Sequence, residues 1–280
     1  MHTWRFKKQL TRLRDSTKAL AVPVTYLILF VSLMAVVSAT YGFAVLKISS
    51  SGASLKASVA KQNMQVLDGT VRSVAWSFGA SEVVYMDDCG GTFQTEPAAK
   101  NLILNFTDRY TFYDVVFNSS VGEASYKLEP SESNYHGLFI RGDYRAIVNQ
   151  SASVMTQLYV AIADDAQTIT LCYRPLATST VTGTSNGKPL NLVRINIINL
   201  NSSQDLMLTE KFHLKVTALN VTTLSYQYEF NQSISSLALE AAFDETTSST
   251  VQLPISSSTE GAIVELEIVV SNIKIQKAEV

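Results

Sequence analysis

Residues 19–46 read ALAVPVTYLILFVSLMAVVSATYGFAVL, a run without a charged side chain that lies between Lys18 and Lys47. A membrane-spanning α-helix needs about 20 apolar residues to cross a hydrocarbon core of about 30 Å. At about 1.5 Å per residue this run reaches about 42 Å, which is enough to span with several residues to spare. Its central part is apolar on every side of a helix, as contact with lipid requires. The stretch therefore predicts a single transmembrane helix over residues 19–46.

The charges on either side of this run predict its orientation. Residues 1–18 form a leader with six basic side chains and one acidic one, whereas the whole chain of 280 residues has a net charge of -2. Lys and Arg collect on the cytoplasmic flank of transmembrane helices. We therefore expect a single-pass protein of the cell membrane, with a cytoplasmic N-terminus, an extracellular C-terminal domain and the lipid bilayer as a partner. A nucleic-acid partner is not expected, because the positive charge lies on the leader and not on the folded part.

Two routes of N-terminal processing compete. Val37-Ser38-Ala39 offers the small residues that a signal peptidase prefers, although the apolar run is longer than the usual ~7–15 residues of a signal core. Cleavage after Ala19, just before the run, would instead leave the helix on the mature protein. Pro23 stands near the start of the run, where it is expected in the first helical turn or at a mild kink.

Residues 47–78 continue with a helical pattern. Mostly apolar side chains recur at steps of three or four residues, and polar residues lie opposite them. The members of this stripe are Leu55, Val59, Gln62, Val66, Thr70 and Val74, flanked by Leu67, Val71 and Phe78. Ser49-Ser-Ser-Gly52 consists of poor helix formers, so we expect a break or bend there. This segment is predicted to leave the membrane and to pack one face on the outer domain.

After Gly79 the pattern changes to period two and to short apolar runs, which indicates β-strands separated by turns. The expected strands are Glu82–Met86, Thr92–Thr95, Asn101–Phe106, Tyr110–Asn118, Ala124–Leu128, His136–Arg141, Val154–Ile162, Thr168–Tyr173, Asn191–Asn199, Phe212–Leu219, Thr223–Phe230, Ser236–Phe243, Thr250–Ile255 and Ala262–Ile275. The predicted fold class is mainly β, with a long N-terminal helix followed by an antiparallel β-sandwich head over residues 79–280. The small, polar stretch 177–190 is either a long hairpin loop around Asn186-Gly187 or a linker that subdivides the head.

Two kinds of residue bear on the compartment. Six Asn-x-Ser/Thr sequences lie beyond the membrane segment and make the protein a candidate glycoprotein. The acceptor residues are Asn105, Asn118, Asn149, Asn201, Asn220 and Asn231. Cys89 and Cys172 are the only cysteines, and an extracellular location favours a disulfide between them over two buried thiols.

The chain shows no catalytic pattern, so we do not expect an enzyme, a cofactor or a metal site. His2, His136 and His213 are isolated, and the chain has no zinc-protease, hydrolase, P-loop or dinucleotide motif. Asp87-Asp88 and Asp164-Asp165 are interpreted as acidic turns in preference to calcium ligands. The tripeptide Arg141-Gly142-Asp143 matches an adhesion motif, but it fits a turn between two strands.

The layout resembles that of archaeal type IV pilin-like proteins, which have a short basic leader, an uncharged run with an early proline, a helix that continues outward and a β-rich head. Two segments carry the resemblance: LDGTVRSVAWSFGA at residues 67–80, similar to the helix end and following turn of that group, and Gly90-Gly-Thr-Phe93, similar to its next strand. The resemblance implies prepilin-type cleavage after Ala19. The glutamate that bacterial pilins place early in the mature helix is absent, and the head is larger than that of many major pilins.

Two functions are therefore expected, in order. The first is a membrane-anchored extracytoplasmic structural protein, a pilin-like surface or filament component, whose further partners are other pilin-like subunits contacted through the apolar helix. The second is a membrane-tethered β-sandwich that recognises a ligand or partner at the cell surface through its loops.

Overall fold

The computed structural model describes residues 3–108, 110–129, 137–149, 155–163, 166–244 and 246–279, with side chains from residue 23 onward. The chain forms two compact units, Met1–Gly52 and Ala53–Val280. The first is entirely helical in its described part, and the second contains all the described strands. The protein is thus mainly β, with one long N-terminal helix and a β-rich head, as the sequence predicted.

The helix α1 comprises Thr3–Val74. It runs through Ser49–Gly52 without interruption, so the predicted break is wrong at the level of secondary structure, although the division between the two units falls at Gly52. Pro23 lies inside α1 and not in its first turn, because the leader is helical too. By length and composition, α1 is the described helix that could cross a membrane.

The head begins where α1 ends. After Val74 the chain turns at Gly79, whose φ of 75° is readily adopted by glycine, and whose N–H donates to the Ala218 carbonyl at 2.9 Å. The strands follow in the order β1 (Ser81–Met86), β2 (Thr92–Thr107), β3 (Tyr113–Leu128), β4 (Leu138–Arg141), β5 (Thr156–Ala163), β6 (Ala166–Tyr173), β7 (Leu176–Ser185), β8 (Lys188–Asn199), β9 (Leu206–Leu208), β10 (Phe212–Phe230), β11 (Ser236–Phe243), β12 (Thr247–Pro254) and β13 (Ala262–Lys277).

These strands form two sheets. The first has the order β1-β10-β13-β8-β7, and the second has the order β12-β11-β2-β3-β6-β5-β4, with β9 paired to β2. All strand pairs are antiparallel except β13 and β8, which run parallel, so the predicted all-antiparallel head is corrected at this pair. Strands so far apart in sequence can pair in either direction, because no tight turn dictates the choice.

Several strands are longer than the sequence pattern indicated. Thr92–Thr95 and Asn101–Phe106 belong to the single strand β2, in which the pairing with β3 shifts between Glu96 and Lys100 and so accommodates Pro97. Phe212–Leu219 and Thr223–Phe230 are likewise one strand, β10, with an irregularity between Ala218 and Asn220. The stretch 177–190, expected as a long loop or a linker, is instead mostly strand: it belongs to β7 and the start of β8, and Asn186 and Gly187 in the tight turn between them both have positive φ.

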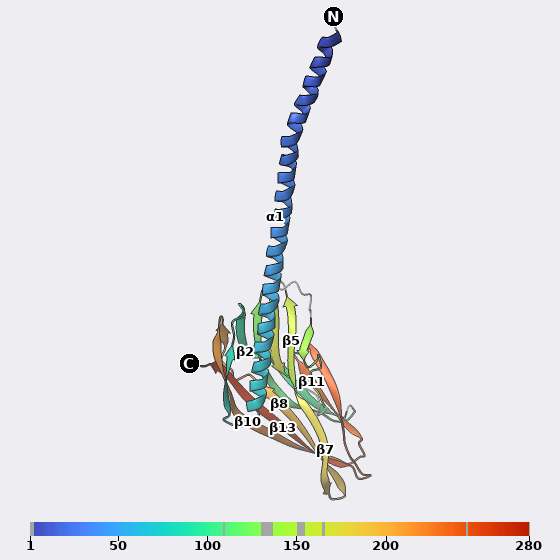
Figure 1. Cartoon of the computed structure of the whole chain (residues 1–280). Helices are drawn as coiled ribbons and strands as arrows, with labels where there is room; N and C mark the ends of the chain where they lie inside the picture. Colours follow the sequence, from blue (N-terminus) through green and yellow to red (C-terminus); the bar gives the residue numbers. More distant parts are fainter. Residues whose placement is uncertain are drawn as a thin grey trace. The chain divides into compact units, whose positions relative to one another are not determined.

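Two apolar clusters hold the head together. The first, called the helix cluster below, packs α1 against strands of both sheets. Figure 1 shows the last turns of α1 running alongside these strands. The sheet cluster joins β2, β3, β11 and β12 of one sheet to β8 and β13 of the other. Ile197 and Ile198, neighbours on β8, belong to different clusters, because consecutive side chains of a strand point to opposite faces.

The buried stripe of α1 differs from the predicted one. It consists of small and medium side chains at steps of three and four residues: Ala57, Ala60, Met64, Leu67, Val71, Val74 and Ala75. Leu67, Val71 and Val74 are buried as predicted, whereas Leu55, Val66 and Phe78 are exposed. A row of side chains at steps of four drifts around a helix of about 3.6 residues per turn, so the predicted row left the buried face toward its N-terminal end.

Candidate functional site

The apolar part of α1 carries few polar groups, and two of its hydroxyls bond to carbonyls of the same helix. Ser32 Oγ donates to the Leu29 carbonyl and Thr40 Oγ1 donates to the Val36 carbonyl, both at 2.8 Å. A hydroxyl needs such a partner in a medium without water. The side chains from residue 23 to residue 49 are all exposed. The side chain of Ala19, the candidate cleavage site, lies outside the described part.

A buried carboxylate joins α1 to the second sheet. Asp68 is fully buried, and its Oδ1 accepts hydrogen bonds from Thr156 Oγ1 at 2.6 Å and from the Tyr173 hydroxyl at 3.1 Å. Its Oδ2 pairs with Arg141 of β4 and, at 3.3 Å, with Arg72 one turn further along α1. Burial, together with the charge of Asp68, raises the pKa of Tyr173, so its hydroxyl stays protonated and donates. This group of contacts fixes the rotation of α1 against the sheet.

The two cysteines do not form the predicted disulfide; both are free and buried. Cys89 belongs to the helix cluster. Cys172 lies on β6 between Leu171 and Tyr173, two members of that cluster, so its own side chain points to the opposite face of the sheet. The two thiols thus occupy different faces of one sheet, which explains why they do not meet.

On the face to which Cys172 points there is a cavity of about 200 Å³. β2, β3, β5 and β6 provide its floor, and the segment Phe139–Tyr144 and the β11–β12 hairpin contribute to its walls. The lining residues are Lys100, Val121, Gly122, Glu123, Phe139, Tyr144, Gln157, Tyr159, Cys172, Tyr173, Phe243 and Thr247. Aromatic rings therefore make up much of the wall, and one ion pair supplies its charge.

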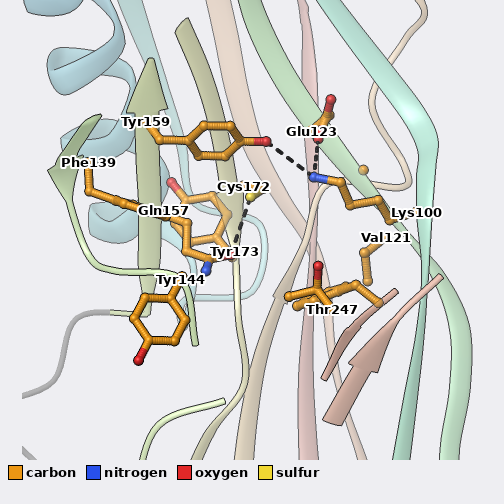
Figure 2. Close-up of a pocket in the computed structure, with 12 residues that line it drawn as sticks. Lys100, Val121, Glu123, Phe139, Tyr144, Gln157, Tyr159, Cys172, Tyr173 and Thr247 are labelled. Atoms are coloured by element: carbon orange, nitrogen blue, oxygen red, sulfur yellow. Dashed lines mark hydrogen bonds and ion pairs between the residues drawn. The ribbon is translucent and has the colours of Figure 1, made fainter. Parts of the chain in front are cut away.

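Lys100 is the central polar residue of this cavity. Figure 2 shows the Glu123 carboxylate and the Tyr159 hydroxyl converging on its ammonium group, at 2.8 Å and 3.5 Å. Burial by itself lowers the pKa of Lys100, but the negative charges that Cys172, Glu123 and Tyr159 carry once ionised outweigh burial and raise the pKa. Burial also raises the pKa of the Cys172 thiol to about 11, so that thiol is neutral at pH 7. Glu123 is therefore the group that holds the ammonium in place at neutral pH.

A second network supports the wall of the cavity. Gln157 Nε2 donates to the carbonyls of Asp143 and Arg145, at 2.8 Å and 3.1 Å, so its Oε1 faces the Cys172 thiol at 3.6 Å. The buried Arg174 also donates to the Arg145 carbonyl, at 3.0 Å, and pairs with the Asp143 carboxylate. Hydrogen bonds from Arg145, and more weakly from Arg174, keep the pKa of Asp143 well below its usual range.

These contacts also explain the Arg141-Gly142-Asp143 tripeptide. Arg141 is paired with Asp68, and Asp143 is paired with Arg145 and Arg174. Gly142 has a φ of 79°, and a Cβ there would overlap the Thr156 carbonyl oxygen. Both charged side chains are engaged within the domain, and the chain bends at Gly142 directly after β4.

The six candidate glycosylation residues differ in exposure. Asn118, Asn220 and Asn231 are exposed, whereas Asn105, Asn149 and Asn201 are half-buried. Asn105 is the least suited of the six to carry a glycan, because its Oδ1 is buried without a hydrogen-bond partner in the described part of the chain. None of these six asparagines lines the cavity.

The remaining sequence candidates that the structure describes lie apart from the cavity. Asp88 Oδ1 caps its own turn by accepting from the Gly90 N–H at 2.8 Å, as expected for an acidic turn. The His213 ring packs on Tyr85, with centroids 5.1 Å apart. His136 and Asp164-Asp165 lie outside the described residues. Among the residues that are described, no three His, Cys, Asp or Glu side chains come together as metal ligands.

Sequence reasoning missed both Asp68 and the cavity. A signal for Asp68 was present, because a carboxylate at this position falls on the same helix face as Met64 and Val71. For Lys100, Glu123 and Cys172 there was no such signal, since they come from three strands whose pairing the sequence pattern did not indicate. Comparisons of the chain with protein-family models, curated proteins and solved structures found no match.

Proposed function

We propose that the protein is a membrane-anchored extracytoplasmic structural protein, a pilin-like component of the cell surface or of a filament. The observation that carries the proposal is the exposed, uncharged segment of α1 after Pro23, in which the Ser32 and Thr40 hydroxyls bond to carbonyls of their own helix. Such a segment is stable in lipid or against other apolar helices and costly to leave in water. The basic leader before it favours a cytoplasmic N-terminus and an extracellular head.

The C-terminal turns of the same helix support the pilin-like layout. From Ala57 onward α1 is buried on one side by the helix cluster and is held by the Asp68 contacts. One helix would thus serve as the anchor at one end and as part of the head at the other. We further infer that the two sheets are the layers of a β-sandwich, because side chains of both meet in the sheet cluster.

Mass spectrometry of the mature N-terminus in the native host tests the pilin-like part. A mature chain that starts at Leu20 supports prepilin-type cleavage after Ala19, and an Ala19→Asp variant should then keep its leader. An intact Met1 favours a permanent tether. A start at Thr40, directly after Val37-Ser38-Ala39, would mean a secreted head and would contradict the anchor.

The cavity favours a second candidate function, a membrane-tethered binding module. A cavity lined by aromatic rings and a half-buried ion pair is typical of a ligand site and is not needed by a purely structural head. The two functions differ in a simple observation. Filaments in purified surface fractions support the first, whereas an anchored monomer that captures a ligand supports the second.

A further inference from the structure

We propose that the cavity around Lys100 binds one ring of a neutral carbohydrate. This inference goes beyond the proposed structural function and does not depend on how the N-terminus is processed. It rests on three features of the cavity: its balance of charge, its free hydrogen-bonding groups and its aromatic walls.

The charge balance argues against a charged ligand. Lys100 and Glu123 are both largely buried, with 29% and 19% of their side chains exposed, and they neutralise each other at 2.8 Å. An anion drawn to Lys100 would approach the Glu123 carboxylate, and a cation drawn to Glu123 would approach the ammonium. A zwitterion could satisfy both groups, but it would have to bury two further charges, which costs far more than burying hydroxyls that find partners.

The free hydrogen-bonding groups suit a hydroxylated ligand. The Lys100 ammonium has three N–H donors, of which two point to Glu123 and Tyr159. Glu123 Oε1 accepts no hydrogen bond from the described residues, since its pairing with Lys100 uses Oε2. Lys100 and Glu123, which both line the cavity, thus keep one donor and one acceptor for a ligand. A sugar hydroxyl accepts one bond and donates another, so a single hydroxyl satisfies both groups.

The aromatic walls suit the carbon skeleton of a sugar. The rings of Phe139 and Tyr159 pack against each other with centroids 5.6 Å apart, and the exposed ring of Tyr144 also lines the cavity. The C–H face of a pyranose ring is apolar and packs on such rings. The volume of about 200 Å³ is far above the ~10–15 Å³ that holds one water, yet below the range of about 300–1,000 Å³ usual for drug-sized ligands. It is suited to one ring.

The test uses the full chain, purified in a detergent without a sugar head group, and titrates methyl glycosides of neutral hexoses and N-acetylhexosamines by calorimetry or ligand-observed NMR. Saturable binding of at least one of these is expected. Because the anomeric carbon of a methyl glycoside is capped, such binding points to a terminal residue of a glycan; binding of the reducing sugar alone points to a free monosaccharide. Either result supports the proposal.

Matched variants locate the binding. Tyr144→Ala should raise the Kd by about fivefold to tenfold, because it removes one aromatic wall. Tyr110→Ala, which removes an aromatic ring that is 93% exposed outside the cavity, should leave the Kd unchanged. The double variant Lys100→Met/Glu123→Gln leaves no unpaired charge, so it should remain folded by circular dichroism and lose binding.

Three results would overturn the proposal. The first is no saturation by any neutral saccharide at concentrations up to about 50 mM. The second is binding that Tyr144→Ala and Tyr110→Ala change equally. The third is tighter binding of amino acids or of acidic sugars than of neutral sugars. None of these results depends on whether the leader is cleaved, so failure here is distinguishable from failure of the proposed anchor.

Discussion

Thr156 Oγ1 on β5 donates a 2.6 Å hydrogen bond to Asp68 Oδ1 on α1, in a place where Asp68 has no exposed surface. The same carboxylate accepts a hydrogen bond from the Tyr173 hydroxyl and forms an ion pair with Arg141. One residue of α1 is therefore bonded to β4, β5 and β6. A buried carboxylate with several partners is stable only while all of them are present. This site should therefore be the most sensitive polar contact between the helix and the sheets.

Replacing Asp68 by Ala should destabilise the head by about 3–5 kcal/mol, because Arg141 and the Tyr173 hydroxyl lose a buried partner. Thermal unfolding of the full chain in detergent measures this. Asp68→Asn keeps the shape and one acceptor and should cost less. Asp205→Ala, at an exposed position, should change stability by less than about 0.5 kcal/mol. Equal losses for Asp68→Ala and Asp205→Ala would contradict the assigned role.

Gly142→Ala should destabilise the head more than Gly137→Ala does. Both glycines have positive φ, 79° and 65°, so both variants carry the backbone strain of about 1 kcal/mol. Only at Gly142 does the added Cβ meet a backbone atom, the Thr156 carbonyl oxygen. The difference between the two melting temperatures isolates that overlap. If Gly137→Ala lowers the melting temperature as much as Gly142→Ala does, the close approach of Gly142 to β5 is contradicted.

Cys89→Ser should lower the melting temperature equally under oxidising and reducing conditions, since the structure contains no disulfide between the described cysteines. The cost comes from placing a hydroxyl in the apolar helix cluster, about 1–3 kcal/mol. As an independent check, thiol labelling in denaturant without reductant should find two reactive thiols in the purified wild type. A melting temperature that falls only under oxidising conditions, or the absence of free thiols, would mean that the two cysteines form a disulfide.

The stability of the head should fall with rising pH between about 9 and 11 in a way that depends on Cys172. Burial raises the pKa of this thiol from 9.0 to about 11. The native state therefore keeps a proton that the unfolded chain has lost, so this contribution is complete below pH 9 and disappears as the pH rises through 11. The loss is at most about 3 kcal/mol, at about 1.4 kcal/mol per pH unit. The unfolding free energy of Cys172→Ser, measured over the same pH range, is subtracted from that of the wild type to remove the effect of the other titrating groups. If the two profiles run parallel between pH 9 and 11, the prediction is contradicted.

Leu33→Arg should reduce membrane insertion by about 2.5–3.5 kcal/mol, because Leu33 lies in the exposed apolar part of α1. Leu33→Phe keeps the segment apolar and serves as the control. Fractionation of cells that express each variant measures the membrane-bound share. Full recovery of Leu33→Arg in the membrane fraction would mean that another feature anchors the protein.

Local features of this protein followed from the sequence alone. The uncharged run from Ala19 predicted a helix, the change of pattern after Gly79 predicted strands, and Asn186-Gly187 predicted a hairpin turn. Each of these depends on residues close together in the chain, whose backbone preferences and hydrophobic periodicity act regardless of the rest. The helix face that is buried was predicted only in part, because a row of side chains at steps of four drifts around a helix of about 3.6 residues per turn.

Only the tertiary structure decided what depends on long-range pairing. The parallel contact of β13 with β8, the separation of Cys89 from Cys172 and the meeting of Lys100 with Glu123 all follow from how strands distant in sequence align. A shift of one residue in such an alignment moves every side chain to the other face of the sheet. The cavity and the Asp68 contacts therefore exist only in the assembled sheets, where register brings their members to one face.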